Sequence, residues 1–122
     1  MKLNHLDLQV SNVQRSVDFF ERYFGLELGS SRTSPAIAIL ADQHGFVLVL
    51  QRKKSDAEAY PEGFHLGVSV DDAEAVHRAH ARLREGGLDV SDVIENNRGV
   101  ILHCKAPDGY AVEVSCPRVK TG

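Results

Sequence analysis

The stretch His5-Leu-Asp-Leu-Gln-Val10 decides the fold, because the chain repeats it as His65-Leu-Gly-Val-Ser-Val70. Each copy is followed by a helix-start signal and an amphipathic segment, and each closes on a turn that leads into an apolar strand. A repeat of this length indicates two copies of one supersecondary unit. At 122 residues the chain is long enough for one compact domain but too short for two independent ones.

The first copy reads as a strand, a helix and two or three further strands. A strand is expected over Lys2–Val10, because aliphatic and polar residues alternate from His5 onward with the period of a strand. Asn12 is the expected N-cap of a helix with apolar residues at helical spacing, and Gly25 is its expected left-handed cap. The strands that follow are expected over Leu26–Ser31, Ala36–Ala41 and Gly45–Gln51.

The second copy repeats this plan. Phe64–Val70 is the expected first strand, and Asp71 with Glu74 three residues later is typical of a capping box at a helix start. The helix should end at Gly86-Gly87. Three more strands are expected over Leu88–Ile94, Val100–Lys105 and Tyr110–Cys116.

The sequence therefore predicts an α+β fold built from two βαβββ modules. Module one covers about residues 1–51, a charged linker covers about 52–62, and module two covers about 63–117 of a single domain, 1–122. A four-stranded sheet with one helix leaves its other face uncovered. Two such sheets are expected to form a curved mixed sheet, a half-barrel with the helices outside and a concave face inside.

Strand parity predicts which side chains project from the uncovered face. The aliphatic residues of the first strands pack under the helices, so the histidines that open the two copies must point the opposite way. Aligning the turn glycines Gly45 and Gly109 places Val49 opposite Glu113. The repeat thus defines four related positions, of which three carry possible metal ligands: His5, Val49, His65 and Glu113.

Composition excludes several classes of function. The net charge of -3 gives no electrostatic case for binding nucleic acid or an anionic membrane. No apolar run approaches the length of a membrane span, and the start of the chain has no signal-peptide pattern, so the cytoplasm is expected. Cys104 and Cys116 make no disulfide framework and are interpreted as reduced, small apolar residues.

The whole chain resembles the vicinal oxygen chelate superfamily, which includes glyoxalase I, fosfomycin-resistance enzymes, extradiol dioxygenases and bleomycin-resistance proteins. The resemblance rests on the opening motif at His5, on the segment from Phe64 to Asp72, and on Pro107-Asp-Gly-Tyr-Ala-Val-Glu113. It implies metal ligands on the first and last strands of each copy. Carried over by position, the resemblance implies a metal site of His5, His65 and Glu113, with Val49 at the fourth position.

Two departures bear on the type of activity. Glyoxalase I has a glutamate where this chain has Val49, and usually an arginine for the glutathione carboxylate where this chain has Gln9. Both count against a glutathione-dependent glyoxalase. Fosfomycin-resistance enzymes and extradiol dioxygenases, by contrast, work with two histidines and one glutamate.

The ligand set fits a divalent metal ion but does not identify it. Two neutral imidazoles and one carboxylate suit Fe, Mn, Ni, Co or Zn. An ion with open positions can bind two adjacent oxygens of a small substrate and stabilise the negative charge that develops there. Lyase, isomerase, transferase and dioxygenase chemistry all remain open, and so does the effect of Val49.

Two further residues are candidate catalytic groups. His103 lies on the penultimate strand, where fosfomycin-resistance relatives place a polar substrate contact, so it is the first candidate for a general acid or base; the alternative is a structural hydrogen bond. Asp7 shares the face of His5 and either contacts substrate or orients a ligand.

A rival interpretation is a metal-free protein that binds an antibiotic or another small ligand, as bleomycin-resistance proteins do. Those proteins typically lack the three ligands and favour aromatic groove walls, whereas this chain keeps the ligands and has no tryptophan. The resemblance also implies a homodimer. Whether His5 meets the other two ligands of its own chain or those of its partner stays open.

Overall fold

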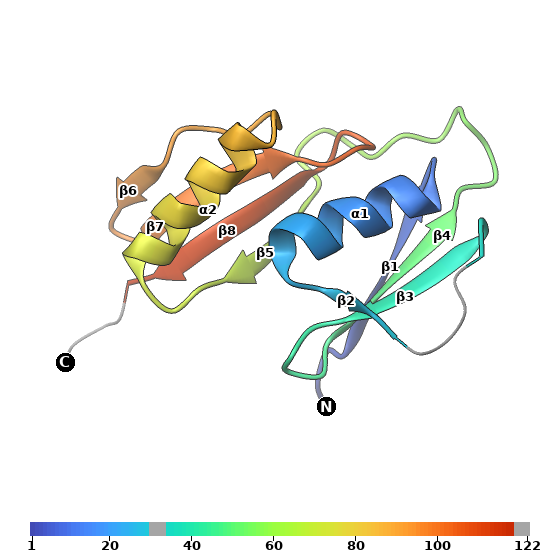
Figure 1. The fold of residues 1–122 in the computed structure, drawn as a ribbon, viewed down its shortest axis with the longest axis horizontal. Helices are drawn as coiled ribbons and strands as arrows, with labels where there is room; N and C mark the ends of the chain where they lie inside the picture. The colour runs from blue at the N-terminus through green and yellow to red at the C-terminus, as the bar shows by residue number, and fades with distance from the viewer. Residues whose placement is uncertain (30–33, 119–122) are drawn as a thin grey trace. The chain divides into compact units, whose positions relative to one another are not determined.

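A computed structural model describes residues 1–29 and 34–118 and divides the chain into two compact units, Met1–Ala59 and Tyr60–Gly122. We refer to them as the first and the second module. Each contains a four-stranded mixed sheet with a helix over one face (Figure 1). The predicted α+β fold of two βαβββ modules is therefore confirmed.

In the first module the strand order is β1-β4-β3-β2, with β1 and β4 parallel and the other pairs antiparallel. Its elements are β1 (His5–Val10), α1 (Val13–Phe24), β2 (Glu27–Leu28), β3 (Ile37–Ala41) and β4 (Val47–Arg52).

The second module has the same order and the same directions, β5-β8-β7-β6. Its elements are β5 (His65–Ser69), α2 (Ala73–Glu85), β6 (Ile94–Asn96), β7 (Gly99–Lys105) and β8 (Ala111–Pro117).

The helix starts follow from short polar side chains that accept a backbone N–H of the first turn. Asn12 accepts the N–H of Arg15 at 3.0 Å, as predicted, and Gly25 closes α1 with a positive φ of 69°. The cap of α2 is Asp72, which accepts the N–H of Ala75 at 2.8 Å. The prediction of Asp71 was wrong by one residue, because Asp72 is the residue with the extended backbone of an N-cap directly before the first helical turn.

The strand predicted over Leu88–Ile94 is also wrong. Before β6 the backbone makes only an isolated bridge, Val90 to Cys104. At the next position the N–H of His103 donates to the side-chain oxygen of Ser91, at 2.9 Å, where a regular ladder would offer a backbone carbonyl. In the first module the strand predicted over Leu26–Ser31 is limited to β2, and the part of that prediction after Gly29 lies outside the described residues.

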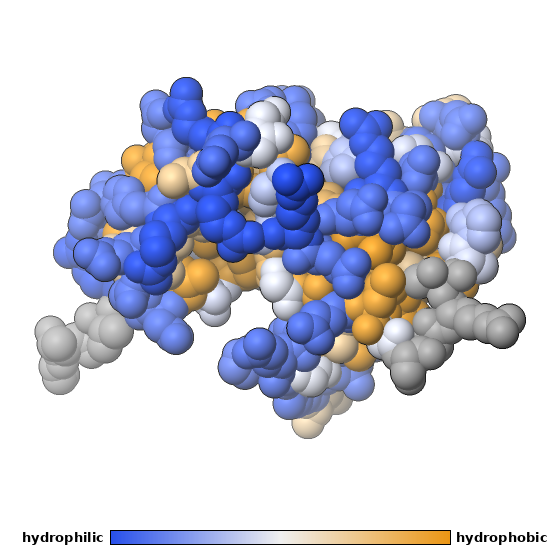
Figure 2. All heavy atoms as spheres, viewed as in Figure 1, coloured by the Kyte–Doolittle hydropathy of each residue, from blue (hydrophilic) through white to orange (hydrophobic). Residues whose placement is uncertain are grey.

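The core of each module lies between the sheet and its helix. Leu8 and Leu50 are buried beneath α1 together with Phe20 of that helix, and Leu83 of α2 is buried against the second sheet. Figure 2 shows the outward surface over α2 as predominantly hydrophilic, as expected of an amphipathic helix. Among the described residues no helix is long and apolar enough to cross a membrane.

Gly99 fixes the pairing of β7 with β8. Its φ of 136° favours glycine, and a Cβ atom at this position would lie 2.1 Å from the carbonyl oxygen of Cys116. No other residue fits so close to β8 here, where Gly99 pairs with Pro117 at the end of the β7–β8 ladder away from its turn. Every other cross-strand pair of β7 and β8 follows from that register.

Neighbouring residues of β4 test the assignment of the two sheet faces. Leu50 is buried beneath α1, whereas Val49 points to the open face and is only half-buried. We expect Leu50→Ala to lower the free energy of unfolding by about 2–5 kcal/mol and Val49→Ala by less than half as much. Urea unfolding of the two variants measures this difference, and equal losses would contradict the assignment.

Candidate functional site

Strand register gives the structural equivalence of the two modules. In the first, Asp7 of β1 pairs with Val49 of β4; in the second, Gly67 of β5 pairs with Glu113 of β8. Both pairs lie two residues after the opening histidine of their module. The alignment of Val49 with Glu113 that the turn glycines predicted is therefore also the alignment of the backbones.

The next strand extends this equivalence. Val49 pairs on its other side with Ile39 of β3, and Glu113 pairs with His103 of β7. The open face of the second module thus brings three polar groups together, and the same positions of the first module hold two aliphatic residues beside a histidine.

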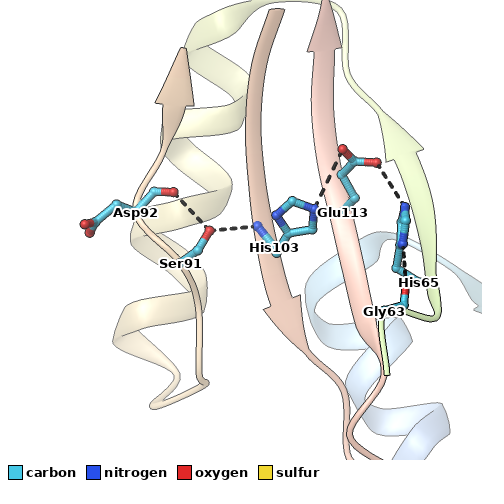
Figure 3. A network of polar contacts seen from close by, with 6 residues as sticks. All are labelled: Gly63, His65, Ser91, Asp92, His103 and Glu113. Atoms are coloured by element: carbon cyan, nitrogen blue, oxygen red, sulfur yellow. Dashed lines mark hydrogen bonds and ion pairs between the residues drawn. The ribbon is translucent and has the colours of Figure 1, made fainter. Parts of the chain in front are cut away.

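The carboxylate of Glu113 lies between two imidazole rings (Figure 3). Its Oε2 is 4.0 Å from Nε2 of His65, and its Oε1 is 3.8 Å from Nε2 of His103. The Glu113 side chain keeps 25% of its surface exposed, while the imidazoles keep 50% and 42%. A carboxylate withdrawn this far from water is stabilised by a nearby cation or by hydrogen-bond donors.

The backbone fixes which nitrogen of His65 is available. Its Nδ1 lies 2.9 Å from the carbonyl oxygen of Gly63, and since a carbonyl only accepts, Nδ1 carries the hydrogen. The neutral ring therefore presents the lone pair of Nε2 toward Glu113, the form in which histidine binds metals. Stacking of Phe64 on Tyr60, with centroids 4.8 Å apart, and packing of Tyr60 against Tyr110 anchor this end of β5.

His103 is held by its backbone. The N–H of Ser91 donates to the His103 carbonyl at 2.8 Å, and the N–H of His103 donates to Oγ of Ser91 at 2.9 Å. Oγ of Ser91 donates in turn to the carbonyl of Asp92 at 2.9 Å (Figure 3). The imidazole stays free to turn toward Glu113, because none of these bonds involves its ring.

The other two predicted residues lie on β1 of the first module. Nδ1 of His5 contacts Oδ1 of Asn4 at 2.7 Å, so Nε2 is again the nitrogen left to bind a ligand. The carboxylate of Asp7 accepts a bond from Nε2 of Gln9 at 2.9 Å, and this amide also donates to Oε1 of Gln51 at 3.3 Å. Both His5 and Asp7 are exposed on the open face of their sheet.

A family model supports the assignment suggested by these positions. The Glyoxalase/Bleomycin resistance protein/Dioxygenase superfamily matches residues 2–114. The chain belongs to this superfamily. The match covers both modules, from the strand of His5 to the strand of Glu113, and it confirms the resemblance seen in the repeated motif.

Individual members of the superfamily are similar over nearly their whole length. The lactoylglutathione lyase of Neisseria meningitidis serogroup A is 30% identical over 125 residues, which cover 93% of this chain and 88% of that one. The lactoylglutathione lyase of Escherichia coli O157:H7 is 25% identical over 126 residues, with coverage of 93% and 91%. Among solved structures, that of a possible glyoxalase from Bacillus cereus aligns with a TM-score of 0.84 at 34% identity, covering 95% of this chain and 99% of that chain.

The donor set of the second module fits a divalent ion, as superfamily members typically use. Within residues 1–29 and 34–118 no three histidine, cysteine or acidic side chains already converge as in a formed metal centre. Ligand atoms about 2.1 Å from an ion are separated by roughly 3.0–3.4 Å. Oε2 of Glu113 and Nε2 of His65, at 4.0 Å, need to approach by less than about 1 Å to share an ion.

Sequence reasoning missed the residues that hold these side chains in place. Ser91 was assigned to a strand, and the carbonyl of Gly63 gives no sequence signal. Gly67 was detectable, because it stands where the first copy has Asp7. A Cβ at Gly67 would lie 3.4 Å from Oε2 of Glu113, so the glycine leaves the carboxylate open on that side.

The two free cysteines test the orientation of β7. Cys104 is buried beside α2, and this burial, with a smaller contribution from Asp89, raises the pKa of its thiol to about 11. At pH 8 about one thiol in a thousand is then ionised, and the thiolate is the reactive form. With Ellman's reagent we expect fast labelling of Cys116 alone, no fast phase in Cys116→Ser, and slow labelling of Cys104. Fast labelling of Cys104 would contradict the orientation of β7, in which the side chain of Cys104 is buried on the face covered by α2.

Proposed function

We propose that this chain is a metal-dependent enzyme that binds a small substrate through two adjacent oxygens at a divalent ion held by His5, His65 and Glu113. The observation that carries the proposal is the contact of Glu113 with a histidine whose Nδ1 is already bonded to Gly63. This arrangement leaves an imidazole nitrogen and a carboxylate aimed at the same point. The ion, whether Fe, Mn, Ni, Co or Zn, supplies Lewis acidity to the substrate oxygens.

The names of the relatives favour lyase or isomerase chemistry of the glyoxalase type over dioxygenation. Lactoylglutathione lyases are among the curated proteins that match the chain over 93% of its length. Val49 and Gln9 differ from the residues that the glutathione-dependent enzymes of this type have. We therefore propose a related reaction on a substrate other than a glutathione conjugate.

Two residues beside the ligands are proposed to act on the substrate. His103 has its backbone fixed by Ser91 and its ring 3.8 Å from Glu113, and we assign it the transfer of a proton to or from the substrate. Asp7 is assigned to the substrate on the side of His5, where its carboxylate is oriented by Gln9.

We further propose that both modules form one domain and that the chain works as a cytoplasmic homodimer on small molecules. Its net charge of -3 favours neither nucleic acid nor a membrane as a partner.

Mixed dimers of His5→Ala and Glu113→Ala subunits distinguish a site within one chain from a site shared between the two subunits. Activity recovers in the mixture if each site takes His5 from one subunit and Glu113 from the other.

Metal content is the direct test of the proposed function. We expect near-stoichiometric divalent metal in protein purified without an affinity tag, and loss of most of it in a His65→Ala, Glu113→Ala double variant. The matched control is His77→Ala, Glu85→Ala, which removes one histidine and one glutamate from the exposed surface of α2. Plasma mass spectrometry gives metal per chain for all three.

Either outcome directs the next step. Metal retained by the control and lost by the site variant supports the ligand assignment, and its identity selects the chemistry to screen. If the purified protein contains no metal and takes up no Fe, Mn, Ni, Co or Zn, the proposal of a metal-dependent enzyme is contradicted and metal-free ligand binding is favoured.

A glutamate in place of Val49 should make the protein less stable without metal and should bind the metal ion more tightly. Val49 pairs with Asp7, so Val49→Glu places two carboxylates on neighbouring positions of one face and, without metal, lowers the free energy of unfolding by about 0.2–1 kcal/mol. With metal the added ligand should tighten binding by on the order of tenfold, equivalent to about 1.4 kcal/mol. Val49→Gln is the control of equal size without charge. Titration calorimetry reads the affinity, and equal affinities for both variants would contradict the placement of Val49 beside the ion.

A further inference from the structure

We infer that the substrate carries an apolar group next to its metal-binding oxygens, and that Ile39 and Val49 of the first module form the subsite for that group. The inference rests on the proposed function and adds the substrate class. It concerns the positions where the two modules share a backbone plan but differ in side-chain chemistry.

The subsite is an aliphatic patch on the open face of β3 and β4. Ile39 and Val49 are cross-strand neighbours, and Ile37 and Val47 extend the patch at either end. Ile39 keeps 40% of its surface exposed and the other three are only half-buried, although none lies at a chain end or in a turn. Within the first module, helix α1 packs on the opposite face of the sheet.

The patch lies one strand from a proposed metal ligand. In the parallel pairing of β1 with β4, His5 is the partner of Val47 and Asp7 is the partner of Val49. Side chains paired across neighbouring strands have Cβ atoms about 4.5–5.5 Å apart. Carbon atoms that adjoin oxygens bound to an ion at His5 are therefore within reach of the patch.

The second module has polar side chains at the positions where the first module has aliphatic ones. The partners that correspond to Ile39 and Val49 are His103 and Glu113. The first module offers no polar group at either position, so it gains nothing from a polar substituent and gains hydrophobic contact from an alkyl or aryl one. The open face of the first module is therefore suited to carbon at the two positions where the second module has polar side chains.

The size of the patch favours a small molecule over a second protein surface. A stable protein interface buries about 800 Å² on each partner. Four half-exposed aliphatic side chains fall well short of that, and a polar row of His5, Asp7 and Gln9 borders them along β1. A short hydrocarbon group attached to an oxygen-rich end matches both parts.

Alkyl hydroxamates test the subsite, since each has two adjacent oxygens that chelate a divalent ion and a tail of chosen length. The probes are acetohydroxamate, butyrohydroxamate and hexanohydroxamate, titrated by calorimetry into the metal-loaded full-length protein. We expect affinity to rise about two- to fourfold for each added methylene. Ile39→Asn should lose most of that rise. Ile94→Asn, the same substitution at an isoleucine of β6 that is 50% exposed, should keep it.

The outcomes separate this inference from the function on which it rests. Binding of acetohydroxamate without any gain from longer tails overturns the apolar subsite and leaves the metal site standing. Failure of every hydroxamate to bind overturns both. If Ile94→Asn reduces the gain in affinity with tail length as much as Ile39→Asn does, the subsite does not lie in the first module. If Ile39→Asn instead changes the molecular mass measured by light scattering and leaves the hydroxamate affinities unaltered, the patch is a subunit interface.

Discussion

The parallel pairing of the first and last strands of each module is the constraint on which the site depends. In the second module this pairing sets Glu113 beside Gly67 and two residues past the partner of His65. Because side chains alternate between the faces of a sheet, a shift of one residue would turn Glu113 under α2, where Val112 and Val114 now pack. The hydrophobic core therefore holds the carboxylate on the open face, although the carboxylate contributes nothing to that core.

The two modules have the same strand arrangement but carry different side chains on their open faces. Both opening histidines have Nδ1 engaged by a nearby oxygen, so both present Nε2. Beyond that point the second module collects nitrogen and oxygen donors, while the first presents aliphatic side chains and moves its carboxylate one strand outward, to Asp7. On the open faces, the cross-strand pair Ile39 and Val49 of the first module corresponds to the pair His103 and Glu113 of the second.

The sequence predicted the faces of the strands better than their ends. Alternation alone was enough to orient His65, His103 and Glu113, because burying an ionisable group beneath a helix is costly whereas burying leucine or valine is favourable. The strand over Leu88–Ile94 failed because the hydroxyl of Ser91 accepts a backbone N–H in place of a carbonyl. Alternation carries no information about such a substitution. Likewise, two successive aspartates before α2 are equivalent in a pattern and become distinct only in backbone geometry.

Contacts made by backbone atoms were the part of the site that no pattern could reveal. The carbonyl of Gly63 selects the tautomer of His65, yet every residue has a carbonyl. Whether it meets a ring nitrogen depends on the course of the chain between Pro61 and β5, where Phe64 packs on Tyr60. Composition identifies the possible ligands, and the path of the main chain determines which of their atoms face outward.

Gly99 has a consequence for how such a protein changes over time. A side chain at residue 99 would clash with the carbonyl oxygen of Cys116, so this end of the β7–β8 ladder depends on glycine and not on the residues of the open face. Residues such as His103 and Glu113 can then be exchanged one at a time without the strands sliding to a new pairing. Substitutions on the open face can therefore change the activity of such a fold without changing its strand pairing, which also makes the fold a practical starting point for redesign.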